Sequence, residues 1–388
     1  PCPSWYAGRL WLLRIGYYKL MRPKPKASDW VWILDHTVQI GAEKCLLILG
    51  VRLSELSRTD LVLSHDDVEP IALFPVTRSN GEVVFQQLEE TIEKTGLPRE
   101  ILGDQGPDLK AGTERFCHQH PQTCAISDIK HKSAALLKHT LQHDEPWKEF
   151  TQQAAQSKSQ IQQTALAFLA PPDQRTKARY MNLEILVRWG QRALAVLDRL
   201  ETRADHRDSH KKLQARLGWL RPFRDHLTEW EALLDVAITS ECFVRERGLW
   251  QGAEVELSER LEQGVVSPRV LALREQLLAF VKSESLKAKP GEHLLGSSEI
   301  IESVLGKLKR LEQNQAKSGF TGLVLSVAAV VSETTREVVQ QAMETVPTKT
   351  VREWIRRHLG QSVQAKRKIA FSNTKRSEQI WDQLFDEL

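Results

Sequence analysis

The chain has 388 residues, which is more than one ordinary domain holds, so its length predicts two or three folded units. The longest apolar stretch, Gly319 to Val331, is too short for a membrane helix, and a membrane-spanning helical protein is excluded. A net charge of +4 permits nucleic-acid binding without requiring it, and five scattered cysteines exclude a dense disulfide framework and predict reduced thiols in the cytoplasm.

Three strands are expected first in chain order. Segments 29–40, 44–53 and 69–78 are short and rich in Val, Ile, Leu and aromatic residues. The second is almost continuously apolar, which is typical of a strand that is buried on both faces. Gly81 then opens a segment with apolar residues at helical spacing, which closes at Gly96.

Strands and helices alternate in the next part of the chain. Residues 99–109 predict a fourth strand that breaks at a Gly-Asp-Gln-Gly-Pro turn, 108–118 a helix, 123–129 a fifth strand, and a third helix follows. The order β-β-β-α-β-α-β-α is that of the ribonuclease-H-like fold. We therefore predict an α/β protein with a mixed five-stranded sheet, helices on both of its faces, and an all-helical insertion domain.

The character of the sequence changes near residue 147, where strand signals stop and helical periodicity begins. Because the chain starts at Pro1 and not at methionine, we expect a piece of a longer protein. The predicted organisation is an N-terminal remnant or linker (1–28), the first half of the core (29–146), a helical insertion (147–290), the second half of the core (291–345) and a basic C-terminal tail (346–388).

Two aspartates occupy positions that carry chemistry in this fold. Asp35 lies on the first strand, and Asp104 follows the fourth strand, which lies beside the first in a ribonuclease-H-like sheet. Two carboxylates brought together repel each other unless a cation lies between them. Oxygen ligands of this kind suit Mg²⁺ or Mn²⁺.

A third acid is expected from a late helix, where Glu299 and Glu302 are available. Ile301, Val304, Leu305 and Leu308 form the apolar stripe that must face the sheet. At about 100° per residue, Glu299 points away from that stripe, whereas Glu302 lies on its flank, on the same side as Lys309. Glu302 is the predicted ligand and Glu299 the reserve.

This set of motifs resembles the DDE transposases, in particular bacterial insertion-sequence and eukaryotic hAT-type enzymes. The resemblance covers roughly residues 29–140 and 291–330. It rests on LDHT with Asp35, ILGDQGPDLKAG with Asp104, EIIESVLGKLK with Glu302 and Lys309 seven apart, and DIKH, in which Asp128 and His131 are similar to a C/D-x-x-H motif. The tyrosine and arginine of the family's Y-R-E-K signature are replaced by Leu295 and Ser298.

The resemblance implies two-metal phosphodiester chemistry at Asp35, Asp104 and Glu302, in which the transposon end is nicked and its 3′-hydroxyl is joined to target DNA. It implies two Mg²⁺ or Mn²⁺ ions per site, double-stranded DNA as the partner, a homodimer or higher oligomer on DNA, and a cytoplasmic location, nucleoid-associated in a bacterium. Further DNA contacts are expected from a stacking tryptophan and from basic residues, namely Trp250, Lys309, Arg356, Arg357, Lys366, Arg367 and Lys368.

Other interpretations remain open. The chain could be a ribonuclease-H-like nuclease without strand transfer, a domesticated transposase that only binds DNA, or a helical scaffold without chemistry. Each predicted site residue also has an ordinary explanation, since an aspartate in a turn or a glutamate on a helix flank is commonly just solvated. A zinc site at Cys117, His118, His120 and Cys124 is disfavoured, because no second Cys/His pair follows at zinc-finger spacing.

Overall fold

The computed structural model divides into two compact units. The first combines Pro1–Ser57, Leu61–Ile126 and Ser298–Leu388, and the second combines Arg58–Asp60 with Ser127–Ser297. The structure describes residues 2–40, 43–56, 60–104, 106–174, 183–201, 207–262, 267–313, 321–359 and 371. The second unit therefore interrupts the first in sequence, and its long segment begins at Ser127, whereas the predicted helical insertion begins at residue 147.

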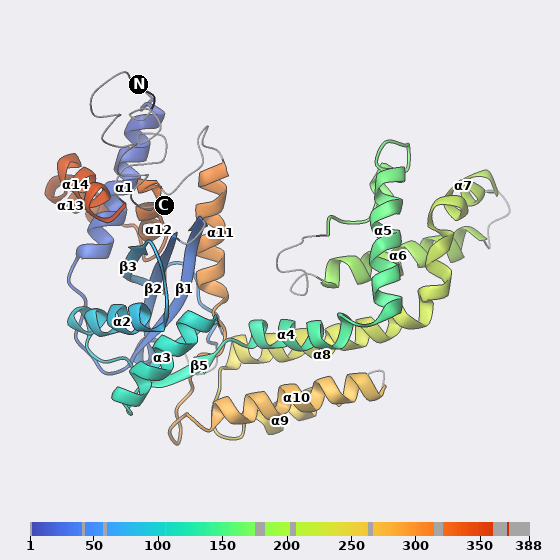
Figure 1. Cartoon of the computed structure of the whole chain (residues 1–388), viewed down its shortest axis with the longest axis horizontal. Helices are drawn as coiled ribbons and strands as arrows, with labels where there is room; N and C mark the ends of the chain where they lie inside the picture. Colours follow the sequence, from blue (N-terminus) through green and yellow to red (C-terminus); the bar gives the residue numbers. More distant parts are fainter. Residues whose placement is uncertain are drawn as a thin grey trace. The chain divides into compact units, whose positions relative to one another are not determined.

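A five-stranded mixed sheet forms the centre of the first unit (Figure 1). Its strands are β1 (Trp30–Ile40), β2 (Glu43–Arg52), β3 (Glu69–Val76), β4 (Glu100–Gly103) and β5 (Cys124–Ser127). They lie in the spatial order β3-β2-β1-β4-β5, with β1 antiparallel to β2, β2 antiparallel to β3, and β1 parallel to β4. This is the arrangement of the ribonuclease-H-like fold, and the predicted fold class is confirmed.

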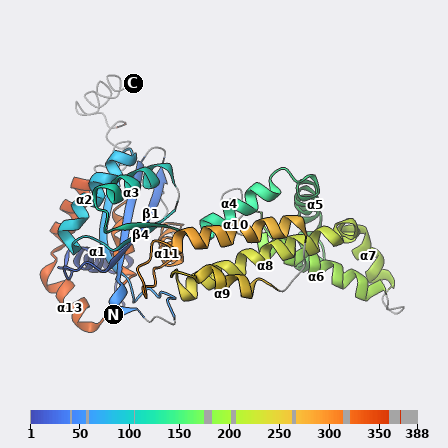
Figure 2. The same cartoon turned by 90° about the horizontal axis from the view of Figure 1, so that it is seen from below.

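The two faces of the sheet are covered by different helices (Figure 2). On one face, α2 (Gly81–Thr95) and α3 (Pro107–Gln119) pack on the even-numbered residues of β1, which share a core with Val84, Leu88 and Phe116. The odd-numbered residues of β1 are equally buried, because α11 (Glu299–Gln313) packs against β1. Burial on both faces explains why these strands are almost continuously apolar.

The predicted N-terminal linker contains a helix. α1 (Trp5–Met21) packs against α12 (Ser326–Ala329) and α13 (Arg336–Thr345), and it also contacts α14 (Thr348–Leu359), which lies in the predicted tail. Apolar residues surround α1 instead of forming one stripe, since Leu13 and Leu20 are buried while Trp5 and Trp11 are exposed. The amphipathic signal that predicts a surface helix is therefore missing here.

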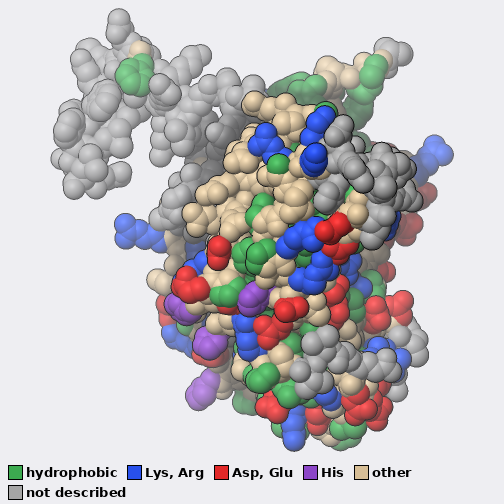
Figure 3. Space-filling view, turned by 90° about the vertical axis from the view of Figure 1, so that its right-hand side faces the viewer, with side chains coloured by type: hydrophobic (Ala, Val, Ile, Leu, Met, Phe, Trp, Pro, Cys, Tyr) green, Lys and Arg blue, Asp and Glu red, His purple; other side chains and the backbone are tan. Residues whose placement is uncertain are grey.

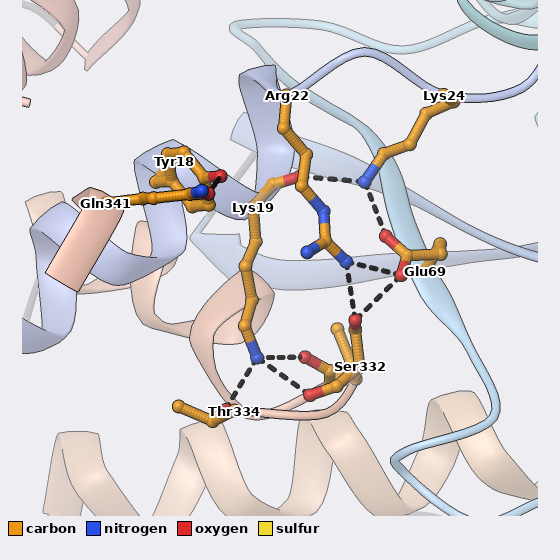
Figure 4. A network of polar contacts seen from close by, with 9 residues as sticks. Tyr18, Lys19, Arg22, Lys24, Glu69, Ser332, Thr334 and Gln341 are labelled. Atoms are coloured by element: carbon orange, nitrogen blue, oxygen red, sulfur yellow. Dashed lines mark hydrogen bonds and ion pairs between the residues drawn. The ribbon is translucent and has the colours of Figure 1, made fainter. Parts of the chain in front are cut away.

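A buried polar network, which we call the α1 latch, ties α1 to β3 and to the segment after α12 (Figure 4). Lys19 is fully buried and donates to the carbonyls of Val331 (2.8 Å) and Ser332 (2.7 Å) and to Thr334 Oγ1 (2.6 Å). Arg22 and Lys24 both pair with Glu69. Every donor of the Lys19 ammonium group is used, which is what its burial requires.

The regular secondary structure described in the second unit is helical, apart from the end of β5 and an isolated bridge between Leu249 and Leu294. Its helices are α4 (Ile129–Leu141), α5 (Glu145–Ile161), α6 (Leu183–Glu201), α7 (Arg207–Leu217), α8 (Arg224–Arg247), α9 (Ala253–Arg260) and α10 (Pro268–Ser285). Aromatic residues fill its core: Trp147 and Trp230 meet edge to face with ring centroids 4.9 Å apart. Trp230 is thus a core residue and offers no surface for base stacking.

Acidic and basic side chains are interspersed on the face of the molecule shown in Figure 3, in keeping with the small net charge. Among the described residues, no helix combines the length and the apolar character needed to cross a bilayer.

Candidate active site

The pairing of β1 with β4 brings the two predicted aspartates to adjacent positions. The last pair in this parallel ladder is Leu34 with Gly103, and Asp35 and Asp104 are the next residues on the two chains. Neighbouring strands lie about 4.8 Å apart. Two aspartates separated by 69 positions in sequence (104 − 35) therefore follow directly after paired positions on neighbouring strands.

The alternation of side chains along β1 decides which face Asp35 points to. Trp32 and Leu34 belong to the core shared with α2 and α3, so Asp35 points to the opposite face, where α11 packs against β1 (Figure 1). The predicted third acid comes from α11. Asp35 and the glutamate helix thus lie on the same side of the sheet.

Within α11, the burial of the side chains follows the predicted stripe. Ile301, Val304, Leu305 and Leu308 are all buried. Glu302 is half-buried on the flank of this stripe, whereas Glu299 and Lys309 are exposed. This geometry favours Glu302 over Glu299 as the residue that can reach the sheet edge.

Asp35, Asp104 and Glu302, all of which the structure describes, do not form a preformed cluster of three metal ligands. In the part of the chain that the structure describes, no three His, Cys, Asp or Glu side chains lie close enough together to hold a metal ion. His120, one of the residues of the zinc alternative, contacts Glu89. The aspartate pair offers hard oxygen donors that fit Mg²⁺ or Mn²⁺, and the approach of Glu302 to that pair stays a prediction.

A polar network that the sequence analysis missed lies next to the aspartates. We call it the Asp108 network: Lys44 Nζ donates to Asp108 Oδ2 (2.7 Å), His36 Nδ1 lies 3.8 Å from the same oxygen, and Ser79 Oγ lies 3.3 Å from His36 Nε2. Burial alone would raise the pKa of Asp108, but hydrogen bonds from Lys44 and Ser79 and the nearby positive charges lower that pKa to about 2. Burial also lowers the pKa of His36, although Asp108 opposes the shift.

No known protein family matches this chain, and no curated protein sequence matches it. Among solved structures, it is similar to the Drosophila P element transposase strand transfer complex. The TM-score is 0.36 and the sequence identity 12%, over 89% of this chain and 86% of that chain. A similarity at this level says nothing about the activity of this chain.

The D-x-x-H motif has a structural explanation in the second unit. Asp128 is buried at the start of α4, where its carboxylate accepts hydrogen bonds from the backbone N–H of His131 (2.7 Å) and contacts His131 Nδ1 (3.0 Å). This is an N-cap, in which a short acidic side chain satisfies a free donor of the first helical turn. The motif therefore stabilises the start of a helix.

The predicted DNA-contacting residues differ in their surroundings. Trp250 lies between α8 and α9, is half-buried, and stacks on His293 with ring centroids 4.9 Å apart. Arg356 and Arg357 are exposed on α14, a helix that buries Val351. Lys366, Arg367 and Lys368 lie outside the described residues. Leu295 and Ser298, which replace the tyrosine and arginine of the family signature, are both buried.

The two glutamates of α11 can be separated by experiment. We expect Glu302→Gln to reduce DNA nicking at least about 100-fold, as loss of one electrostatic group in an active site does, whereas Glu299→Gln should keep near-parental activity. Both variants remove one charge from the first turn of the same helix. The measurement is the nicking rate of both variants with Mg²⁺. A large loss in Glu299→Gln together with near-parental activity in Glu302→Gln would show that the assignment of Glu302 as the third acid is wrong.

Proposed function

We propose that this chain is the catalytic part of a DDE-type DNA transposase, in which Asp35, Asp104 and Glu302 hold two Mg²⁺ or Mn²⁺ ions. The observation that supports the proposal is the parallel pairing of β1 with β4, after which Asp35 and Asp104 are the next residues on the two chains, with Asp35 on the side of the sheet where α11 packs. Few structural roles require two adjacent carboxylates at a sheet edge, because their repulsion costs stability unless a cation offsets it.

The reaction follows from what the side chains can do. The three carboxylates would hold and orient the divalent ions, which would supply activation of the attacking hydroxyl and stabilisation of the leaving oxygen. A phosphorus–oxygen bond breaks when water attacks, leaving a 3′-hydroxyl at the transposon end. In the joining step that hydroxyl attacks a target phosphodiester, so one bond forms as another breaks and no further cofactor is needed. Lys309, seven residues beyond Glu302, would neutralise a nearby DNA phosphate.

The competing functions predict different products in one assay. The protein is incubated with Mg²⁺ and end-labelled duplexes taken from the DNA that flanks its own coding sequence, together with a supercoiled target plasmid. A transposase gives nicked ends and labelled plasmid; a nuclease without strand transfer gives nicks only; a domesticated binder retards the duplexes and cuts nothing. Absence of labelled plasmid despite efficient nicking would refute the strand-transfer part of the proposal.

The basic C-terminal residues are expected to bind DNA phosphates without sequence preference. Neutralising Arg356, Arg357, Lys366, Arg367 and Lys368 should flatten the dependence of log affinity on log salt by up to about 0.9 per lost contact, since each contact releases counterions. The measurement is DNA affinity between about 50 and 200 mM salt. Because Arg356 and Arg357 are exposed, their replacement should leave the fold intact.

Lys211 and Lys212 on α7 provide the matched control, since both are exposed lysines in the second unit. Neutralising them should change the salt dependence much less. An unchanged slope in the five-residue variant would mean that the tail is only a solvated surface.

A further inference from the structure

The Asp108 network joins four segments that surround the two aspartates. His36 comes from β1 directly after Asp35, Lys44 from β2, Ser79 from the connection between β3 and α2, and Asp108 from the first turn of α3. The side chains of His36, Lys44 and Asp108 are at most 24% exposed. By strand alternation, His36 and Lys44 lie on the face of the sheet that α2 and α3 cover, opposite to the face of Asp35.

Asp108 is also close to Asp104 through the turn between them. The backbone N–H of Gly106 donates to Asp104 Oδ1 (3.0 Å), and a Cβ atom at Gly106 would lie 3.0 Å from Asp104 Oδ1 and 3.6 Å from Asp108 Oδ1. Both carboxylates therefore flank the same glycine. Whatever fixes Asp108 also fixes the turn that carries Asp104.

We propose that the Lys44–Asp108 ion pair is a positioning device for the candidate metal site, which fixes the turn that carries Asp104 and the part of β1 that carries Asp35. The pair clamps the start of α3 to β2 and so fixes the Asp104 turn. Through His36 and Ser79 the same carboxylate fixes β1 directly after Asp35. This inference rests on the proposed function, because it concerns residues that support the proposed metal ligands.

The ion pair has the properties that such a device needs. Asp108 stays charged across the physiological range, because its hydrogen bonds with Lys44 and Ser79 hold its pKa at about 2. It lies in the first turn of α3, where the helix dipole also favours a negative charge. Groups that orient metal ligands without binding the metal themselves typically contribute 10- to 100-fold to metal affinity.

The test is Mn²⁺ binding to the whole chain without DNA, measured by electron paramagnetic resonance of the free ion. We expect Asp108→Asn and Lys44→Met each to weaken Asp35-dependent Mn²⁺ binding about 10- to 100-fold. The double variant should be little worse than either single variant, because both remove the same ion pair. Lys44→Arg should restore most of the affinity, since it keeps the charge.

Asp29→Asn is the matched control. Asp29 pairs with Arg52 at the other end of β1 and β2 and accepts a hydrogen bond from the Ser54 backbone, so its loss removes another ion pair that involves β2. It should lower the stability of the protein by a similar amount while leaving the Mn²⁺ affinity unchanged. An equal loss of affinity in Asp29→Asn would reduce the Lys44–Asp108 pair to a purely structural contact and overturn the inference.

Two failures can be told apart. If the parent protein shows no Mn²⁺ binding that is lost in Asp35→Asn, the proposed function is refuted, and the inference is refuted with it. If the parent shows Asp35-dependent binding that Asp108→Asn leaves unchanged, only the positioning role is refuted. Should Asp108→Asn not fold, Lys44→Met tests the same ion pair, and unchanged Mn²⁺ affinity in that variant refutes the role equally.

Discussion

Replacing Asp35 by asparagine is expected to abolish both DNA nicking and strand joining while DNA binding persists. Asparagine keeps the shape of the side chain at the end of the β1–β4 ladder but removes the negative charge that a divalent ion needs. Loss of one such electrostatic group costs about 3–4 kcal/mol of transition-state stabilisation, or roughly 100- to 1000-fold in rate. DNA binding rests mainly on phosphate contacts with basic residues elsewhere and should change little.

The measurement compares the parent and Asp35→Asn in three assays: nicking, joining and retardation of the flanking duplex. Circular dichroism and thermal unfolding of both proteins provide the control for folding. Parental nicking rates in Asp35→Asn would remove the argument for a metal site altogether. Loss of DNA binding together with activity would instead indicate a folding defect, and Asp104→Asn would then serve as the second variant.

The second large effect is expected in the α1 latch. Burial alone would raise the pKa of Glu69, but its hydrogen bond with Arg22 and the charge of Lys24 outweigh burial and lower that pKa from 4.5 to about 2. Because the folded-state pKa lies below the unfolded one, the ionised Glu69 stabilises the fold fully above pH 4.5, and this contribution is lost as pH falls towards 2. A shift of this size corresponds to about 3 kcal/mol.

Glu69→Gln should therefore lower the stability of the first unit by about 2–3 kcal/mol at pH 7, and the difference from the parent should shrink as the pH is lowered below about 4.5. Hydrogen exchange of the peptide that spans α1 reports this directly, because Lys24 and Arg22 follow that helix and hold its end to Glu69. Glu93→Gln, an exposed residue of α2, is the control and should change stability by less than about 0.5 kcal/mol. A difference that stays constant with pH would show that the ion pairs contribute nothing.

Much of the first unit could be predicted because its strands are short, apolar and bounded by turn residues. The apolar first strand, which carries Asp35, and the Gly-Asp-Gln-Gly-Pro turn, which carries Asp104, are both recognisable in the sequence. The turn after β4 was also placed correctly, although β4 itself ends at Gly103 and α3 begins at Pro107. Local periodicity and turn chemistry suffice for such features, because each is set by residues that are close in sequence.

The polar networks could not be predicted, because they depend on which distant segments meet. Lys44 and Asp108 are 64 positions apart, and Ser79 and His36 are 43 apart. Nothing in the neighbourhood of Lys44 distinguishes it from an ordinary strand-end lysine. The spacing of Asp104 and Asp108, one helical turn apart, was the only available signal, and it becomes meaningful only once β1, β2 and α3 are known to adjoin.

The α1 latch has a consequence for the co-translational folding of the protein. Lys19 and its acceptor Val331 are separated by 312 positions. At about 5–20 residues per second, roughly 15–60 s pass between the synthesis of α1 and that of its partner. During this interval the apolar surface of α1 is uncovered, while the helices of the second unit emerge in one uninterrupted stretch and can fold. Nascent chains stalled when residue 297 has left the ribosomal exit tunnel should therefore carry a folded second unit and bind chaperones through α1.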